Sequence, residues 1–80
     1  MSRQHIDLNI ETEYYQLQEQ WIKTFEFRKD DRNIQPYDMI TLYEVVKWTR
    51  TGRHLEPREV RYVFREPIFW MPEWYCIFNF

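Results

Sequence analysis

The residues best suited to chemistry stand together in the segment Lys23–Arg32, which reads KTFEFRKDDR. Its cations can contact phosphate groups, which supplies affinity without reading a base sequence. These cations are Lys23, Arg28, Lys29 and Arg32. Thr24 and Glu26 can hydrogen-bond the edge of a base. The opposing interpretation is that Glu26 merely forms a solvent-exposed ion pair with a neighbouring arginine, which would contribute less than about 1 kcal/mol.

Aromatic rings flank this segment, and stacking a base on such a ring contributes roughly 1–3 kcal/mol. The candidate rings are Trp21, Tyr37 and Trp48. A second basic stretch, residues 47–65, contains Arg53, which we assign to the same binding surface. The net charge of the chain is -2, so the sequence favours one local basic face over a generally basic nucleic-acid binder. The alternative is that the second stretch only solvates a hairpin.

Length and composition indicate one globular domain spanning residues 1–80. The apolar fraction is 44% and the charged fraction 30%, which argues against disorder. Aromatic residues make up 20% of the chain, so a small domain can bury a large area per residue. With Gly52 as the only glycine, glycine-rich phosphate loops are excluded.

The counts of cysteine and histidine, and the lack of a long apolar run, limit the cofactors and the cellular location that we expect. Cys76 is the only cysteine, and with two histidines it cannot complete a structural zinc site. We therefore expect no metal and no cofactor. No apolar run approaches the roughly 20 residues of a membrane span, and residues 1–10 do not resemble a signal peptide. The expected location is the cytoplasm, without membrane association.

Two periodicities outline the secondary structure. Residues 4–10 alternate as a half-buried strand, with Ile6, Leu8 and Ile10 on one face. Residues 12–22 have helical spacing and leave glutamines such as Gln18 to solvent. The apolar face of this helix comprises Tyr14, Leu17 and Trp21.

The rest of the chain favours strands. In order, we predict a strand at 23–29, a turn at 30–33, a strand at 38–48, a turn around Gly52 at 49–55, a strand at 58–65 and a last strand at 74–80. One main helix with about five short strands suits an α+β fold, built as a small, curved β-sheet or barrel.

The segment Lys23–Arg32 resembles the signature of ASCH domains (activating signal cointegrator homology) in the PUA-like superfamily. It is especially similar to a small ASCH-like family of bacteria and phages, which typically reads Gly-Lys-Lys-Thr-Phe-Glu-Ile-Arg-Lys-Asn-Asp-Arg. Tyr37-Asp38 and Thr51-Gly52-Arg53 follow at matching distances. The chain departs from the family at Trp21 and Tyr37, where the family has glycine. These rings would either fill part of a cleft or offer stacking surfaces.

The resemblance implies a PUA-like barrel with a cleft beside the first helix, used by relatives for RNA or modified nucleotides. We therefore expect a small binding module that recognises RNA or a nucleotide. Some ASCH proteins hydrolyse the amide of an acetylated cytidine with a lysine, a threonine and a glutamate. In this chain Lys23, Thr24 and Glu26 would take those roles, although we expect binding rather than catalysis.

The C-terminal residues 68–80 contain six aromatic residues and a single charge. A small domain cannot necessarily bury them all, and an exposed apolar patch marks a partner surface. Trp70, Met71 and Trp74 are the candidates for contact with a host protein or with a second copy of the chain. We therefore expect either a monomer or a homodimer. Alternatively, these side chains cover the core. A phage accessory role is an expectation from the resemblance alone.

Overall fold

The computed structural model describes residues 3–65 and 73–80. In this part of the chain the elements are β1 (His5–Glu11), α1 (Thr12–Glu19), β2 (Phe25–Lys29), β3 (Met39–Val46), β4 (Thr49–His54), β5 (Arg58–Glu59), β6 (Tyr62–Phe64) and β7 (Tyr75–Asn79). Strands with one short helix make the protein an α+β fold. No helix in the described ranges has the length and apolar character needed to cross a bilayer.

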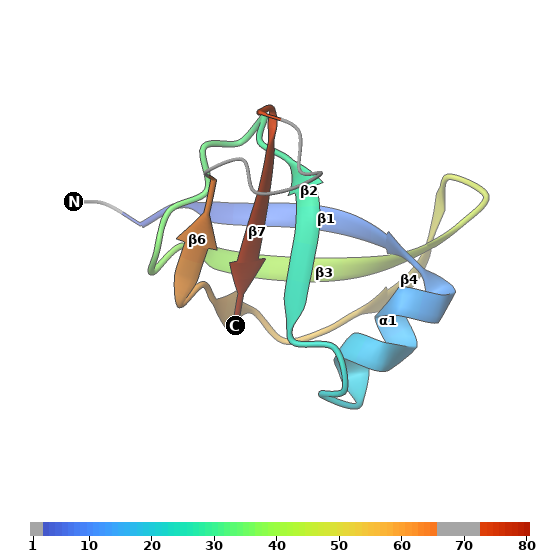
Figure 1. The fold of residues 1–80 in the computed structure, drawn as a ribbon. Helices are drawn as coiled ribbons and strands as arrows, with labels where there is room; N and C mark the ends of the chain where they lie inside the picture. The colour runs from blue at the N-terminus through green and yellow to red at the C-terminus, as the bar shows by residue number, and fades with distance from the viewer. Residues whose placement is uncertain (1–2, 66–72) are drawn as a thin grey trace.

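The strands form two sheets. In the first, β1, β3 and β4 are neighbours and β5 also pairs with β3; in the second, the order is β2-β7-β6. β1 runs parallel to β3, and the connection between them passes through α1 and β2. Figure 1 shows β2 and β7 crossing steeply over the β1–β3 pair. Among the described residues there are seven strands and no pairing joins the two sheets, so the predicted barrel of about five strands is not observed.

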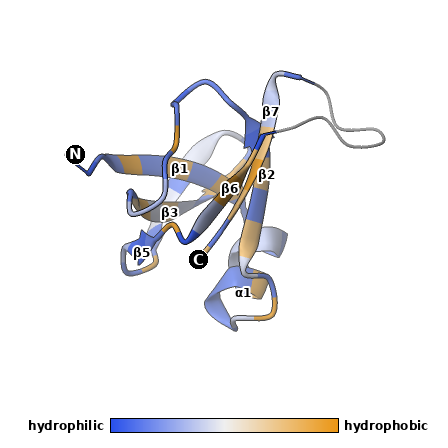
Figure 2. Cartoon of the chain, turned by 60° about the vertical axis from the view of Figure 1, so that its left-hand side comes forward, coloured by the Kyte–Doolittle hydropathy of each residue, from blue (hydrophilic) through white to orange (hydrophobic). Residues whose placement is uncertain are grey.

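The hydrophobic core lies between the two sheets. The predicted alternation in β1 is confirmed, because Ile6, Leu8 and Ile10 are buried and the residues between them are exposed. Figure 2 shows this alternation as hydrophobic and hydrophilic bands along β1. The facing sheet contributes Cys76 and Phe78 to the same core cluster. Burial of this apolar surface is the main force that holds the sheets together.

The helix is shorter than predicted and buries a different face. It ends at Glu19, and its buried residues are Tyr15 and Gln18. Tyr14 and Trp21, which the helical spacing assigned to the buried face, are 47% and 58% exposed. The spacing fails because Trp21 lies beyond the helix with a φ of 59°, in the left-handed region.

The predicted turn around Gly52 is part of a strand. β4 covers Thr49–His54, and the chain reverses at Lys47 and Trp48, whose φ values are 47° and 71°. Positive φ at both central positions is typical of a two-residue type I′ hairpin turn, for which Asn-Gly is the usual sequence. Because Lys47 and Trp48 occupy these positions instead, the sequence does not predict a turn here.

The predicted strand at 58–65 divides between the two sheets. The backbone N–H of Val60 donates to the carbonyl of Asp38, at the first sheet, over 2.8 Å. The N–H of the next residue, Arg61, donates to the carbonyl of Asn79 in β7, also over 2.8 Å. Adjacent residues thus bond to different sheets, so the chain passes from one layer to the other between β5 and β6.

Candidate functional site

A groove with a volume of about 500 Å³ lies where β2 passes the end of β1 and the start of α1; we call it the Lys23 groove. Its lining residues are Asn9, Ile10, Glu11, Tyr14, Lys23, Glu26, Phe27, Arg28, Lys29 and Tyr75. Three cations stand against two carboxylates in this lining, so the groove carries one net positive charge.

The position of β2 at the edge of its sheet explains how these side chains meet. Among the described residues β2 pairs with β7 alone, so β2 is an edge strand of its sheet. The guanidinium of Arg28 donates a hydrogen bond to the carbonyl oxygen of Asn9 in β1. The alternation of the strand turns Glu26 inward, where it is 4% exposed.

Glu26 is a buried carboxylate held between cations. The Lys23 ammonium lies 3.7 Å from its Oε1, and the Nε of Arg28 lies 3.8 Å from its Oε2. Both distances exceed the range of a direct hydrogen bond, so the cations balance the charge without directing their donors fully at Glu26. These donors can therefore serve a second anion in the groove.

Behind Glu26, a buried polar network crosses the molecule through Gln18. The amide nitrogen of Gln18 donates to Glu26 Oε1 over 3.0 Å and to the carbonyl of Phe25 over 2.9 Å. The amide oxygen of Gln18 accepts a hydrogen bond from Arg58 over 2.9 Å. Sequence reasoning assigned Gln18 to solvent and missed this role, because a lone glutamine in a helix carries no signal that distinguishes the two environments.

Aromatic rings lie beside the cations of the groove. The Lys23 ammonium lies 4.6 Å from the centre of the Tyr14 ring and 5.5 Å from that of Phe25. Phe27 and Tyr75 stack on each other with ring centres 5.0 Å apart. The groove thus combines positive charge with flat apolar surface.

The structure brings together four of the predicted binding residues and separates others. Lys23, Glu26, Arg28 and Lys29 share the Lys23 groove, and Arg32 lies in a smaller adjoining hollow of about 130 Å³ that Arg28 and Lys29 also line. Thr24 is half-buried and is not among the lining residues of the groove. Of the three residues considered for hydrolysis, only Lys23 and Glu26 therefore meet in it.

Two further predicted residues lie outside the groove lining. Tyr37 is 66% exposed, and its backbone N–H donates to Val60. Arg53 pairs with Glu19 over 3.3 Å and with Glu44 over 3.6 Å. The side chain of Arg53 is therefore engaged with carboxylates rather than directed at the Lys23 groove.

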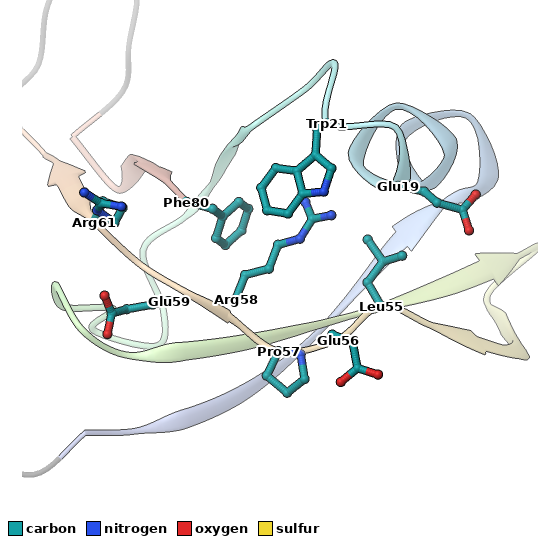
Figure 3. A pocket seen from close by; sticks show the side chains of 9 residues that line it. All are labelled: Glu19, Trp21, Leu55, Glu56, Pro57, Arg58, Glu59, Arg61 and Phe80. Carbon is teal, nitrogen blue, oxygen red and sulfur yellow. The ribbon is translucent and has the colours of Figure 1, made fainter.

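A larger hollow of about 570 Å³ lies between the end of α1 and β5 (Figure 3); we call it the Arg58 pocket. Its lining residues are Glu19, Trp21, Leu55, Glu56, Pro57, Arg58, Glu59, Arg61 and Phe80. The guanidinium of Arg58 lies 3.8 Å from the centre of the Trp21 ring. Trp21 thus lines this pocket rather than plugging the Lys23 groove. The sequence pattern did not single out Arg58, because it reads as one cation among many in residues 47–65.

The remaining candidates add little to the site. Trp70 and Met71 of the proposed partner surface fall within residues 66–72, outside the described residues. Trp74 is 70% exposed, which leaves it available to a partner.

Cys76 is buried, and this burial raises the pKa of its thiol. Within residues 3–65 and 73–80, no group of three or more potential ligands could hold a metal ion.

The fold and the groove define a small α+β domain with a basic, aromatic-lined groove at the edge of a sheet. The chain belongs to the family described as Domain of unknown function (DUF3850), which matches residues 5–80. No curated protein matches the chain.

Proposed function

We propose that the protein is a small binding module for RNA, and that the Lys23 groove holds one nucleotide, ordinary or modified. The observation that carries this proposal is the convergence of Lys23, Arg28 and Lys29 with the Tyr14 and Tyr75 rings around one hollow. Cations supply affinity for phosphate, and aromatic rings supply a surface for a base. The buried carboxylate of Glu26 adds an acceptor for the hydrogen-bond donors of a base edge.

The same segment supports a proposed relationship to ASCH domains of the PUA-like superfamily. The motif that resembles the ASCH signature starts at Lys23, and much of it lines the groove. A family motif that gathers around a hollow is more consistent with a ligand site than with a role in folding alone. The departure at Trp21 affects the Arg58 pocket and leaves the lining of the Lys23 groove unchanged.

The β3–β4 hairpin extends this surface beyond the groove. The Nε of Arg50 donates to the side-chain oxygen of Asn9, a groove residue, over 2.8 Å. Trp48 stands two residues earlier in the hairpin turn and is 92% exposed. Of the three cations in residues 46–54, Arg53 is paired with carboxylates, whereas Lys47 and Arg50 form no ion pair with another described residue. A strand of RNA that leaves the groove on this side meets positive charge and an exposed indole.

Replacing Lys29 by glutamine should weaken binding of a fluorescein-labelled, single-stranded oligoribonucleotide of about ten nucleotides. The exposed lysine contacts phosphate in this proposal, so its loss reduces the slope of log affinity against log salt by about 0.7. Fluorescence anisotropy at several salt concentrations measures both quantities. Lys23→Gln should act in the same direction.

Arg61→Gln is the control, because Arg61 is an exposed cation outside both the groove lining and the β3–β4 hairpin. Its effect on affinity should be smaller than that of Lys29→Gln. Unchanged affinity and salt slope in both groove variants would remove the Lys23 groove from the proposal. Wild-type protein that binds no oligoribonucleotide at low salt would reject RNA binding itself and favour a protein partner.

Trp48→Ala should weaken oligoribonucleotide binding about fivefold or more, which is the loss of at least about 1 kcal/mol of base stacking. The melting temperature should not change, because the indole is 92% exposed. The affinity for a mononucleotide should also stay the same, since it occupies only the groove. Tyr37→Ala is the control: Tyr37 is a similarly exposed ring outside the groove lining. If both substitutions reduced binding equally, the hairpin would have no special part in it.

A further inference from the structure

The Arg58 pocket has features that the proposed RNA binding does not use. Figure 3 shows the Arg58 side chain rising from β5 into the space between Trp21 and Phe80. The ring centres of Trp21 and Phe80 lie 3.8 Å and 5.8 Å from the guanidinium. Leu55 and Pro57 complete the apolar part of the lining. The pocket therefore surrounds one positive charge with flat hydrocarbon.

The guanidinium of Arg58 is buried without a carboxylate partner. Arg58 is 8% exposed, and it donates to the side-chain oxygen of Gln18 over 2.9 Å and to its backbone carbonyl over 2.7 Å. No carboxylate of the described residues lies within 4.0 Å of it. Buried arginines are rare unless paired, because desolvation penalises the charge. The same desolvation lowers the pKa of Arg58.

Trp21 holds its place over Arg58 in a costly backbone conformation. Its φ of 59° lies in the left-handed region, which costs a bulky residue on the order of 1–3 kcal/mol. The ring is nevertheless 58% exposed, so burial of the indole does not account for the conformation. This conformation places the Trp21 ring over the guanidinium of Arg58, where it forms an aromatic wall of the pocket.

The charges at the rim restrict the kind of anion that the pocket can take. Three glutamates and two arginines line it, which sums to one net negative charge. Glu19 pairs with Arg53 and Glu59 pairs with Arg3, each over 3.3 Å, whereas Glu56 forms no ion pair with another described residue. These carboxylates repel a dianion such as a phosphate monoester. A single negative charge suffices to balance Arg58.

We propose that the Arg58 pocket binds a small organic carboxylate with a flat apolar body. The carboxylate accepts hydrogen bonds from N–H groups of Arg58; a guanidinium has five such groups, and Gln18 accepts from two of its nitrogens. The apolar body lies against Trp21 and Phe80. The volume of about 570 Å³ falls within the usual range for small-molecule sites.

The test compares three probes of similar shape by isothermal titration calorimetry: 3-phenylpropanoate, its neutral analogue 3-phenylpropan-1-ol, and phenyl phosphate. The carboxylate should bind at least tenfold more tightly than either of the others. Equal binding of the alcohol would show that Arg58 makes no use of the charge and would overturn the proposal. Tighter binding of phenyl phosphate would contradict the proposal that the glutamates at the rim of the pocket repel a dianion. Absence of carboxylate binding at millimolar concentration would reject the site.

Two variants complete the test. Arg58→Gln should abolish the preference for the carboxylate over the alcohol, but it also disturbs the Gln18 network. Trp21→Gly removes the aromatic wall and relieves the left-handed φ, so it should fold and lose at least tenfold in carboxylate affinity. Tyr37→Gly is its matched control, with a φ of 77° and no part in the lining of the pocket. Equal affinities of the two glycine variants would overturn the proposal. Lys29→Gln should leave carboxylate binding unchanged, which separates this site from the Lys23 groove.

Discussion

The Gln18→Leu variant is expected to lose about 3 kcal/mol of unfolding free energy, since each buried group left without its partner costs roughly 1–3 kcal/mol. Gln18 is fully buried and connects Arg58 with Glu26. Leucine has a similar size, so the loss comes mainly from polar groups rather than from a cavity. A domain of this size has a total stability of only about 5–15 kcal/mol, so the variant should be visibly destabilised at room temperature.

Urea denaturation followed by tryptophan fluorescence measures this effect as a lower midpoint with an unchanged slope. Gln16→Leu is the matched control, because Gln16 is an exposed glutamine of the same helix. Its stability should stay within about 0.5 kcal/mol of the wild type. Equal stabilities of the two variants would mean that the network contributes nothing net to folding.

Phe78→Ala should destabilise the protein by about 3–5 kcal/mol, the usual cost of truncating a buried phenylalanine. Phe78 is 1% exposed and lies in β7, the central strand of the second sheet. Its ring contacts Phe80 edge to face, with centres 5.8 Å apart. Removal of this ring opens a cavity between the two sheets, where the surrounding backbone is held by strand pairing and cannot close over it.

The control for Phe78→Ala is Phe25→Ala in the neighbouring strand, because the Phe25 ring is 47% exposed. Thermal unfolding monitored by circular dichroism should show a large decrease in melting temperature for the first variant and a small one for the second. Similar decreases in the two variants would indicate that the core does not lie between the sheets as described.

Local periodicity in the sequence was sufficient for several elements. Alternation predicts β1 together with its buried face, and it predicts β2 to within a few residues; the last strand, predicted at 74–80, is observed as β7. The cations of the Lys23 groove are neighbours along the chain, so their proximity follows from one strand and the turn before it. Such features depend on the geometry of a few consecutive residues, which a strand pattern already contains.

Other features depend on partners far along the chain. Arg58 stands 40 residues after Gln18, and the burial of each is possible only because the other satisfies its polar groups. The same holds for the inward face of β2, where Glu26 is buried because Gln18 and two cations surround it. Hydrophobicity alone assigns all three side chains to solvent. Only the tertiary structure, which brings Gln18 of α1 against Glu26 of β2 and Arg58 of β5, supplies the hydrogen bonds and countercharges that make their burial stable.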